Sequence, residues 1–205
     1  MVMSVLMRIL KCVVAALLLT DPALAVAQES GAQDPVAQAQ DPVAQEQSDP
    51  ARDLLQQLHE ADPSEARKVE REIALDWRRS GSPAMDLLLT RGQDALEAGE
   101  IDTAVGHFSA LVDHAPEFAE GWHRRATAYY RQEEFGLALS DLGRTLTLNP
   151  DHFNALFGLA VILETLDRPE AAHRAYSRVL DVYPTHERAQ EAEDRLRASA
   201  TGRRI

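Results

Sequence analysis

Histidines and the acidic residues beside two of them are the side chains of this chain best suited to metal or acid–base chemistry. A zinc site needs ligands at set intervals, such as a His-Glu-x-x-His run on one helix. The seven histidines are His59, His107, His114, His123, His152, His173 and His186. None of their spacings matches such a motif. In Asp113-His114 and Asp151-His152 a carboxylate precedes an imidazole, but both pairs adjoin a proline that closes a helix. A histidine at a helix end is the simpler interpretation, and we expect no metal site.

Covalent and phosphate-transfer chemistry also lack their usual residues. Cys12 is the one cysteine, and the chain has neither a Gly-rich phosphate loop nor a Gly-x-Ser-x-Gly elbow. The sequence therefore predicts no catalytic residue, no cofactor and a protein that is not an enzyme.

The first 27 residues have the pattern of a secretory signal peptide. Arg8 and Lys11 precede an apolar run over residues 12–19, and small-x-small cleavage sites end at Ala25 and at Ala27. We expect cleavage near one of these alanines and export to a bacterial periplasm. An uncleaved anchor is the alternative, but this run is under half of the roughly 20 residues that span a bilayer. Cys12 opens the apolar run instead of following it, which disfavours lipid attachment.

Net charge limits the partners of the exported chain. The formal charge is -12, and loss of residues 1–27 removes two positive charges and one negative charge, giving -13. A nucleic-acid partner requires clustered positive charge, so we expect none. Cleavage also removes Cys12, and stability must then come from packing without disulfides.

Residues 28–50 form a low-complexity segment in which residues 32–38 recur letter for letter as 39–45. Such a stretch has too little apolar area to offset the cost of ordering the chain, so we expect a disordered spacer. The alternative hypothesis is a docking motif for a partner.

From residue 51 onward the chain is rich in helix formers and carries an internal repeat. Pro116, Pro150 and Pro184 are separated by 34 residues each. Five further columns share this period: Leu88, Trp122 and Leu156; Gly92, Ala126 and Ala160; Ala95, Tyr129 and Leu163; Ala104, Ala138 and Ala172; Phe108, Leu142 and Tyr176.

Each unit resembles a tetratricopeptide repeat, with Ala95 as the one departure because the family prefers a bulky residue there. The resemblance covers residues 85–184, in frames 85–118, 119–152 and 153–186. It implies an all-α solenoid of three helical hairpins whose small residues mark the helix crossings. The repeat is a scaffold that serves many tasks, so its signal is stronger for fold than for function.

Segments on both sides of the repeats are expected to be helical. Residues 51–81 predict a helical pair, which we interpret as an N-terminal cap; a dimerisation hairpin is the alternative. Residues 185–198 predict a C-terminal capping helix with a thin apolar stripe and a polar outer face.

In this family the first helices of successive units line a concave groove that receives a peptide or a partner helix. The matching positions predict a partner-binding groove lined by Leu89, Gln93, Leu96, His123, Arg124, Thr127, Tyr130, Arg131, Asn154, Phe157 and Val161. A subset of the family grips a carboxylate with lysines and asparagines here, but these repeats contain no lysine, so that residue set is not carried over. The alternative is that the flanking helices fill the groove.

These features together predict a non-enzymatic scaffold or adaptor in the periplasm. It would hold a protein or peptide partner in cell-envelope assembly, integrity or secretion, without a stable membrane span. The alternative is a self-associating structural subunit of an envelope complex, which allows a homo-oligomer.

Overall fold

The computed structural model describes residues 50–202, with side chains through 198. The chain divides into two units, Met1–Gln45 and Glu46–Ile205, and the described residues all belong to the second. The predicted signal peptide (1–27) and almost all of the predicted spacer (28–50) lie outside them.

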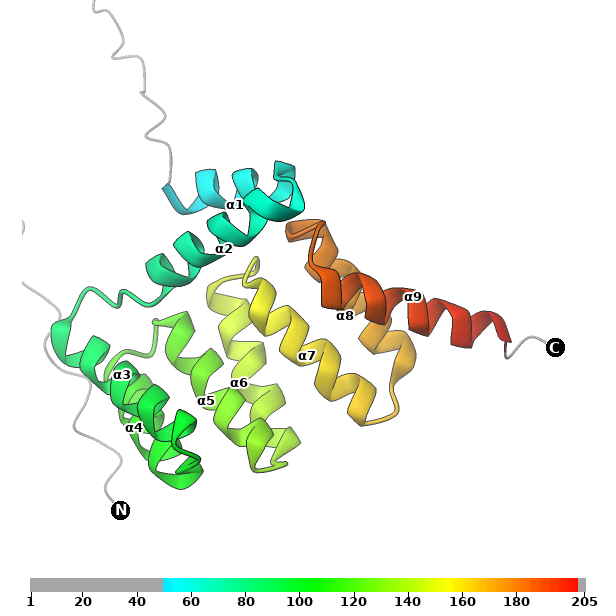
Figure 1. Cartoon of the computed structure of the whole chain (residues 1–205). Helices are drawn as coiled ribbons and strands as arrows, with labels where there is room; N and C mark the ends of the chain where they lie inside the picture. Colours follow the sequence, from blue (N-terminus) through cyan, green and yellow to red (C-terminus); the bar gives the residue numbers. More distant parts are fainter. Residues whose placement is uncertain (1–49, 203–205) are drawn as a thin grey trace, which may run out of the picture. The chain divides into compact units, whose positions relative to one another are not determined.

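Within residues 50–202 the chain forms helices and no strand, which confirms the all-α fold (Figure 1). The helices are α1 (Pro50–Glu60), α2 (Pro63–Trp77), α3 (Pro83–Glu97), α4 (Ile101–His114), α5 (Ala119–Arg131), α6 (Phe135–Leu148), α7 (Phe153–Thr165), α8 (Pro169–Val182) and α9 (Glu187–Gly202). Consecutive pairs α3–α4, α5–α6 and α7–α8 form three similar hairpins that stack in order.

The first helix of each hairpin ends in the same turn. The second residue after the helix has a positive φ in all three units: 78° at Gly99, 61° at Glu133 and 53° at Asp167. The next amide donates back to a carbonyl five residues earlier, as in the bond from Glu134 N to Tyr129 O. This is the Schellman ending of a helix, which glycine adopts most easily. The 34-residue period is therefore present in backbone geometry as well as in sequence.

Small side chains lie where the two helices of each hairpin cross. Ala104, Ala138 and Ala172 are fully buried, as are Ala126 and Ala160 to within 2%. At Gly92 a Cβ atom would overlap the ring of Phe108, so only glycine fits this crossing without a shift. The equivalent positions hold Ala126 with Leu142 in the second unit and Ala160 with Tyr176 in the third, so glycine occurs at this crossing in the first unit alone.

The helical pair α1–α2, here called the N-terminal hairpin, does not cap the first unit. Its buried residues Leu58, Val69 and Ile73 belong to the apolar cluster of α7, α8 and α9. Trp77 stacks on His152 with ring centroids 4.1 Å apart and also contacts Phe153 at 5.0 Å. The expectation of a cap on the first unit is therefore corrected, and the apolar face assigned to dimerisation in the alternative is buried within one chain.

Polar bonds hold the same hairpin to the end of the solenoid. His59 Nδ1 lies 3.0 Å from the carbonyl of Asp181, and the Tyr183 hydroxyl donates to Glu70 at 3.2 Å. The other end of α2 reaches the starts of α5 and α7, where Trp77 shares a small cavity with Glu120 and His152. The N-terminal hairpin thus contacts both the second and the third repeat.

The first unit tolerates an uncovered outer face because that face is partly polar. Asp94 is exposed, whereas the corresponding residues of the next units, Ala128 and Ile162, are buried against the preceding hairpin. Leu87 is the exception and is 49% exposed. At the other end, α9 packs Ala189, Ala192 and Leu196 against the repeats, as its apolar stripe predicts.

Candidate functional site

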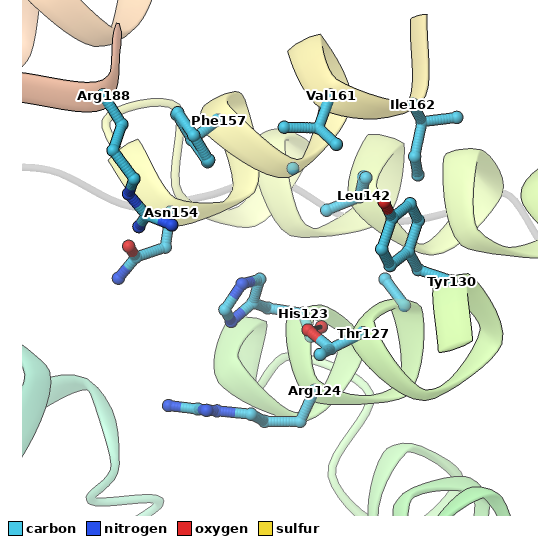
Figure 2. Close-up of a pocket in the computed structure, with 12 residues that line it drawn as sticks. His123, Arg124, Thr127, Tyr130, Leu142, Asn154, Phe157, Val161, Ile162 and Arg188 are labelled. Atoms are coloured by element: carbon cyan, nitrogen blue, oxygen red, sulfur yellow. Dashed lines mark hydrogen bonds between the residues drawn. The ribbon is translucent and has the colours of Figure 1, made fainter. Parts of the chain in front are cut away.

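A cavity of about 630 Å³ lies between the first helices of the second and third units, α5 and α7. Figure 2 shows the open space between these helices, with side chains converging on it from both. Seven residues assigned to the groove from sequence line it: His123, Arg124, Thr127, Tyr130, Asn154, Phe157 and Val161. The groove is therefore open at the second and third units and is not filled by the flanking helices.

The remaining four predicted residues lie elsewhere. Leu89 and Leu96 are only 1% and 6% exposed, since both pack in the cluster that joins α3 to α4 and to Ala128 of α5. Their expected exposure in the groove is wrong. Arg131 donates from Nη1 to the carbonyl of Leu96 at 2.8 Å, and Gln93 is half-buried outside the cavity.

The cavity also has lining residues that the sequence analysis did not assign. Its floor includes four small or aliphatic residues, Ala126, Leu142, Gly158 and Ile162, and its rim includes Arg188 from α9. Arg188 follows Asn154 by 34 residues. Extending the repeat period into the capping helix would have identified it.

The two ends of the groove differ in chemistry. Figure 2 places Arg188, Asn154, His123 and Arg124 around one end, and Tyr130, Leu142 and Ile162 at the other. An aromatic ring and arginines around an apolar floor are the side chains enriched where proteins bind tightly.

One buried carboxylate holds the polar end in place. Glu120 on α5 receives the Nε–H of Arg124 on one oxygen. Its other oxygen lies 3.3 Å from His123 Nδ1 and 3.1 Å from His152 Nε2. Two groove residues are therefore anchored by a carboxylate that is only 3% exposed.

Electrostatics keep this carboxylate ionised. Burial acts to raise the pKa of Glu120, but hydrogen bonds from His123 and His152, with the charge of Arg124, hold that pKa well below its ordinary value. Burial lowers the pKa of His152 to about 4, which outweighs the opposing effect of Glu120. His152 is consequently neutral at pH 7 beside an ionised glutamate.

Glu120, His123 and His152 place three potential metal-ligand atoms within 4.8 Å of one another. The hydrogen bonds of His152 argue against a cation there. Its Nδ1 accepts the amide N–H of Ala155 at the start of α7, so the single proton of the neutral ring resides on Nε2, facing Glu120. A metal ion on Nε2 would move that proton to Nδ1. Nδ1 could then no longer accept the Ala155 amide, and the helix cap would be lost. These residues fit a hydrogen-bonded carboxylate better than a metal centre.

Comparison with known proteins agrees with the repeat geometry. A tetratricopeptide-repeat family model matches residues 89–144 and 123–187. A TPR repeat-containing protein of Rhizobium etli is 33% identical over 145 residues, which cover 71% of each chain. The chain belongs to the tetratricopeptide-repeat family. The family's repeats mediate interactions with proteins or peptides, and the fold is typically a non-catalytic scaffold.

Solved tetratricopeptide-repeat structures share the fold at low sequence identity. The first repeat domain of Spaghetti (RPAP3), bound to the HSP90 peptide SRMEEVD, is 24% identical, with a TM-score of 0.55 over 57% of this chain and 93% of that one. MamA is 18% identical, with a TM-score of 0.55 over 71% of this chain and 83% of that one. Among residues 50–202, no helix combines the length and apolar composition needed to cross a bilayer.

Proposed function

We propose that this tetratricopeptide-repeat protein is a non-enzymatic adaptor that holds an extended segment of a protein partner between α5 and α7. The open cavity carries the proposal, because Tyr130, Phe157 and Val161 line it and each keeps part of its apolar surface accessible. Rings already fixed by neighbouring side chains lose little freedom on binding, and Phe157 is held by Tyr176 and His186 with centroids 5.6 and 5.0 Å away.

A photo-crosslinking amino acid tests this placement in cells. We expect crosslinks to a partner when the probe replaces Thr127 or Val161, which line the groove, and none when it replaces Ser140, which is exposed on α6. A Tyr130→Ala, Phe157→Ala double variant should abolish the groove crosslinks while its helical circular dichroism stays intact. Equal crosslinking from Ser140 and Thr127 would show that the partner does not bind specifically in the groove.

We also propose that the adaptor acts in the bacterial periplasm, in envelope assembly, integrity or secretion. The charged start, apolar run and small-x-small sites of residues 1–27 support export. Fusion of residues 1–40 to a phosphatase that is active only after export should give activity. An Arg8→Glu, Lys11→Glu variant should lose it, and an inactive wild-type fusion would contradict the assignment.

A further inference from the structure

The capping helix α9 contributes directly to the groove. The start of α9 is fixed there by His186, the residue before the helix. Its ring accepts the amide N–H of Ala189 at 3.1 Å and lies 5.0 Å from the ring of Phe157. The guanidinium of Arg188, two residues after His186, lies over the Phe157 ring at 4.6 Å from the ring centroid. The helix therefore holds an arginine at the groove rim in a defined position.

Arg188 is a second cation at this rim, and it also borders a smaller cavity lined by Glu70 and Glu187. The charge of Arg124 is balanced by the buried Glu120. Among residues 50–198, no carboxylate forms an ion pair with Arg188, although the chain as a whole carries a net charge of -12. A positive site on an acidic protein favours an acidic ligand at that site over the rest of the surface.

The stacked geometry prepares Arg188 for a carboxylate. A guanidinium that lies over an aromatic face keeps the N–H groups along its edge available, and these match the two oxygens of a carboxylate. The contact with Phe157 also restricts the side chain before a ligand arrives, which reduces the entropy lost on binding.

Asn154 indicates how the ligand continues past this point. Asn154 and Arg188 line the same cavity, and Figure 2 draws both at its polar end. A carboxamide both donates and accepts, so it complements one peptide unit of a chain that runs through the groove. The apolar end at Tyr130, Val161 and Ile162 then suits an apolar side chain of the same segment.

We infer that Arg188 is a specificity residue that selects partner segments carrying an acidic side chain near an apolar one. This inference rests on the proposed function and extends it, since Arg188 lies one residue beyond the last position matched by the family model. The capping helix would thus choose the ligand as well as close the solenoid.

Blocked model peptides test the inference by NMR titration of the full chain. The probes are acetylated, C-terminally amidated peptides with one glutamate and one leucine separated by one, two or three glycines, and the same peptides with glutamine for glutamate. We expect the glutamate peptides to shift the amides of Asn154, Phe157 and Arg188, and to bind about tenfold more tightly than the glutamine peptides. Arg188→Gln should remove this preference, and Arg174→Gln, on the exposed face of α8, should leave it unchanged.

Four outcomes would overturn the inference. If Arg188→Gln keeps the preference for glutamate, another group reads the acid. If the glutamate peptides bind only when they are made with a free terminal carboxylate instead of the amide, the groove recognises a chain end. If both peptide sets bind equally well in the groove, the proposed function stands without this specificity, whereas the absence of any groove shift counts against both.

Discussion

At the residue scale, the groove depends on a side chain that does not line it. Glu120 fixes His123 and Arg124, and it belongs to the same repeat column as Asn154 and Arg188. One position in successive units thus supplies a buried anion, an amide at the groove and a cation at its rim. The period predicts where these residues lie, but only their neighbours determine which becomes buried.

Replacing Glu120 by glutamine should destabilise the protein by about 1.5 to 3 kcal/mol, because Arg124, His123 and His152 lose a charged hydrogen-bond acceptor at a buried position. Urea denaturation measures this difference. The control is Glu117→Gln, which removes an exposed bridge to Arg144 and should cost about 0 to 1 kcal/mol. Equal costs for the two variants would show that the Glu120 network adds no stability.

Stability should also fall as the pH drops from about 6.5 to about 4. The pKa of His152 is lowered to about 4 in the fold, so over this range the unfolded chain binds a proton that the folded chain does not. The loss is about 1.4 kcal/mol per pH unit for this one group. From about pH 4.5 downward Glu120 adds a further loss, because its pKa in the fold is well below this ordinary value, so the unfolded chain takes up the proton first.

His152→Asn is the matched variant for this pH dependence. Asparagine is a good helix cap and does not titrate, so the variant should keep the start of α7 and flatten the slope between pH 6.5 and 4. Unfolding midpoints at a series of pH values provide the measurement. An unchanged slope would assign the effect to another group.

At the element scale, the sequence predicts each hairpin well and its surroundings less well. The 34-residue period locates the helix crossings, because the same small residues must recur wherever two backbones approach. The period does not show that Leu89 and Leu96 are buried against α4 and α5. Their burial depends on how α5 packs against the first unit, which the repeat columns do not specify. The helical spacing of apolar residues predicts an apolar face on α2, but it does not show which distant helix covers that face.

The crossing in the first unit gives a direct test of packing. Gly92→Ala should destabilise by about 1 to 3 kcal/mol because the added methyl group overlaps Phe108. Gly106→Ala, where the new Cβ meets nothing within 4 Å, should stabilise by about 0.5 to 1 kcal/mol through helix propensity. Thermal and urea unfolding measure both, and a stabilising Gly92→Ala would mean that Phe108 moves aside at little cost.

At the scale of the whole molecule, contacts between the N-terminal hairpin and the last unit distinguish this array from a simple solenoid. Units in a solenoid contact only their neighbours, so stability is a sum of local terms. Here Trp77 contacts Phe153, 76 residues later in the sequence, and Tyr183 bonds to Glu70 across a separation of 113 residues. The hairpin and the last unit should therefore open together.

Trp77→Ala tests this coupling. We expect a loss of about 3 kcal/mol, because the ring stacks on His152 and Phe153. Hydrogen exchange should accelerate in α1, α2, α7 and α8, and remain slow in α3 and α4. Leu75→Ala is the control, since Leu75 is 59% exposed. Uniform acceleration in all helices would contradict a separate opening unit.

The position of the N-terminal hairpin also limits how this array can evolve. Only five residues, 78–82, join α2 to α3, and they span at most about 18 Å. A duplicated unit would push His152 and Phe153 roughly 10 Å farther from α3, one helix-packing distance away. Repeat proteins commonly lengthen by copying a unit, but here each copy would separate Trp77 from its partners. An added unit would therefore need a longer linker, or the contacts of Trp77 with His152 and Phe153 would be lost.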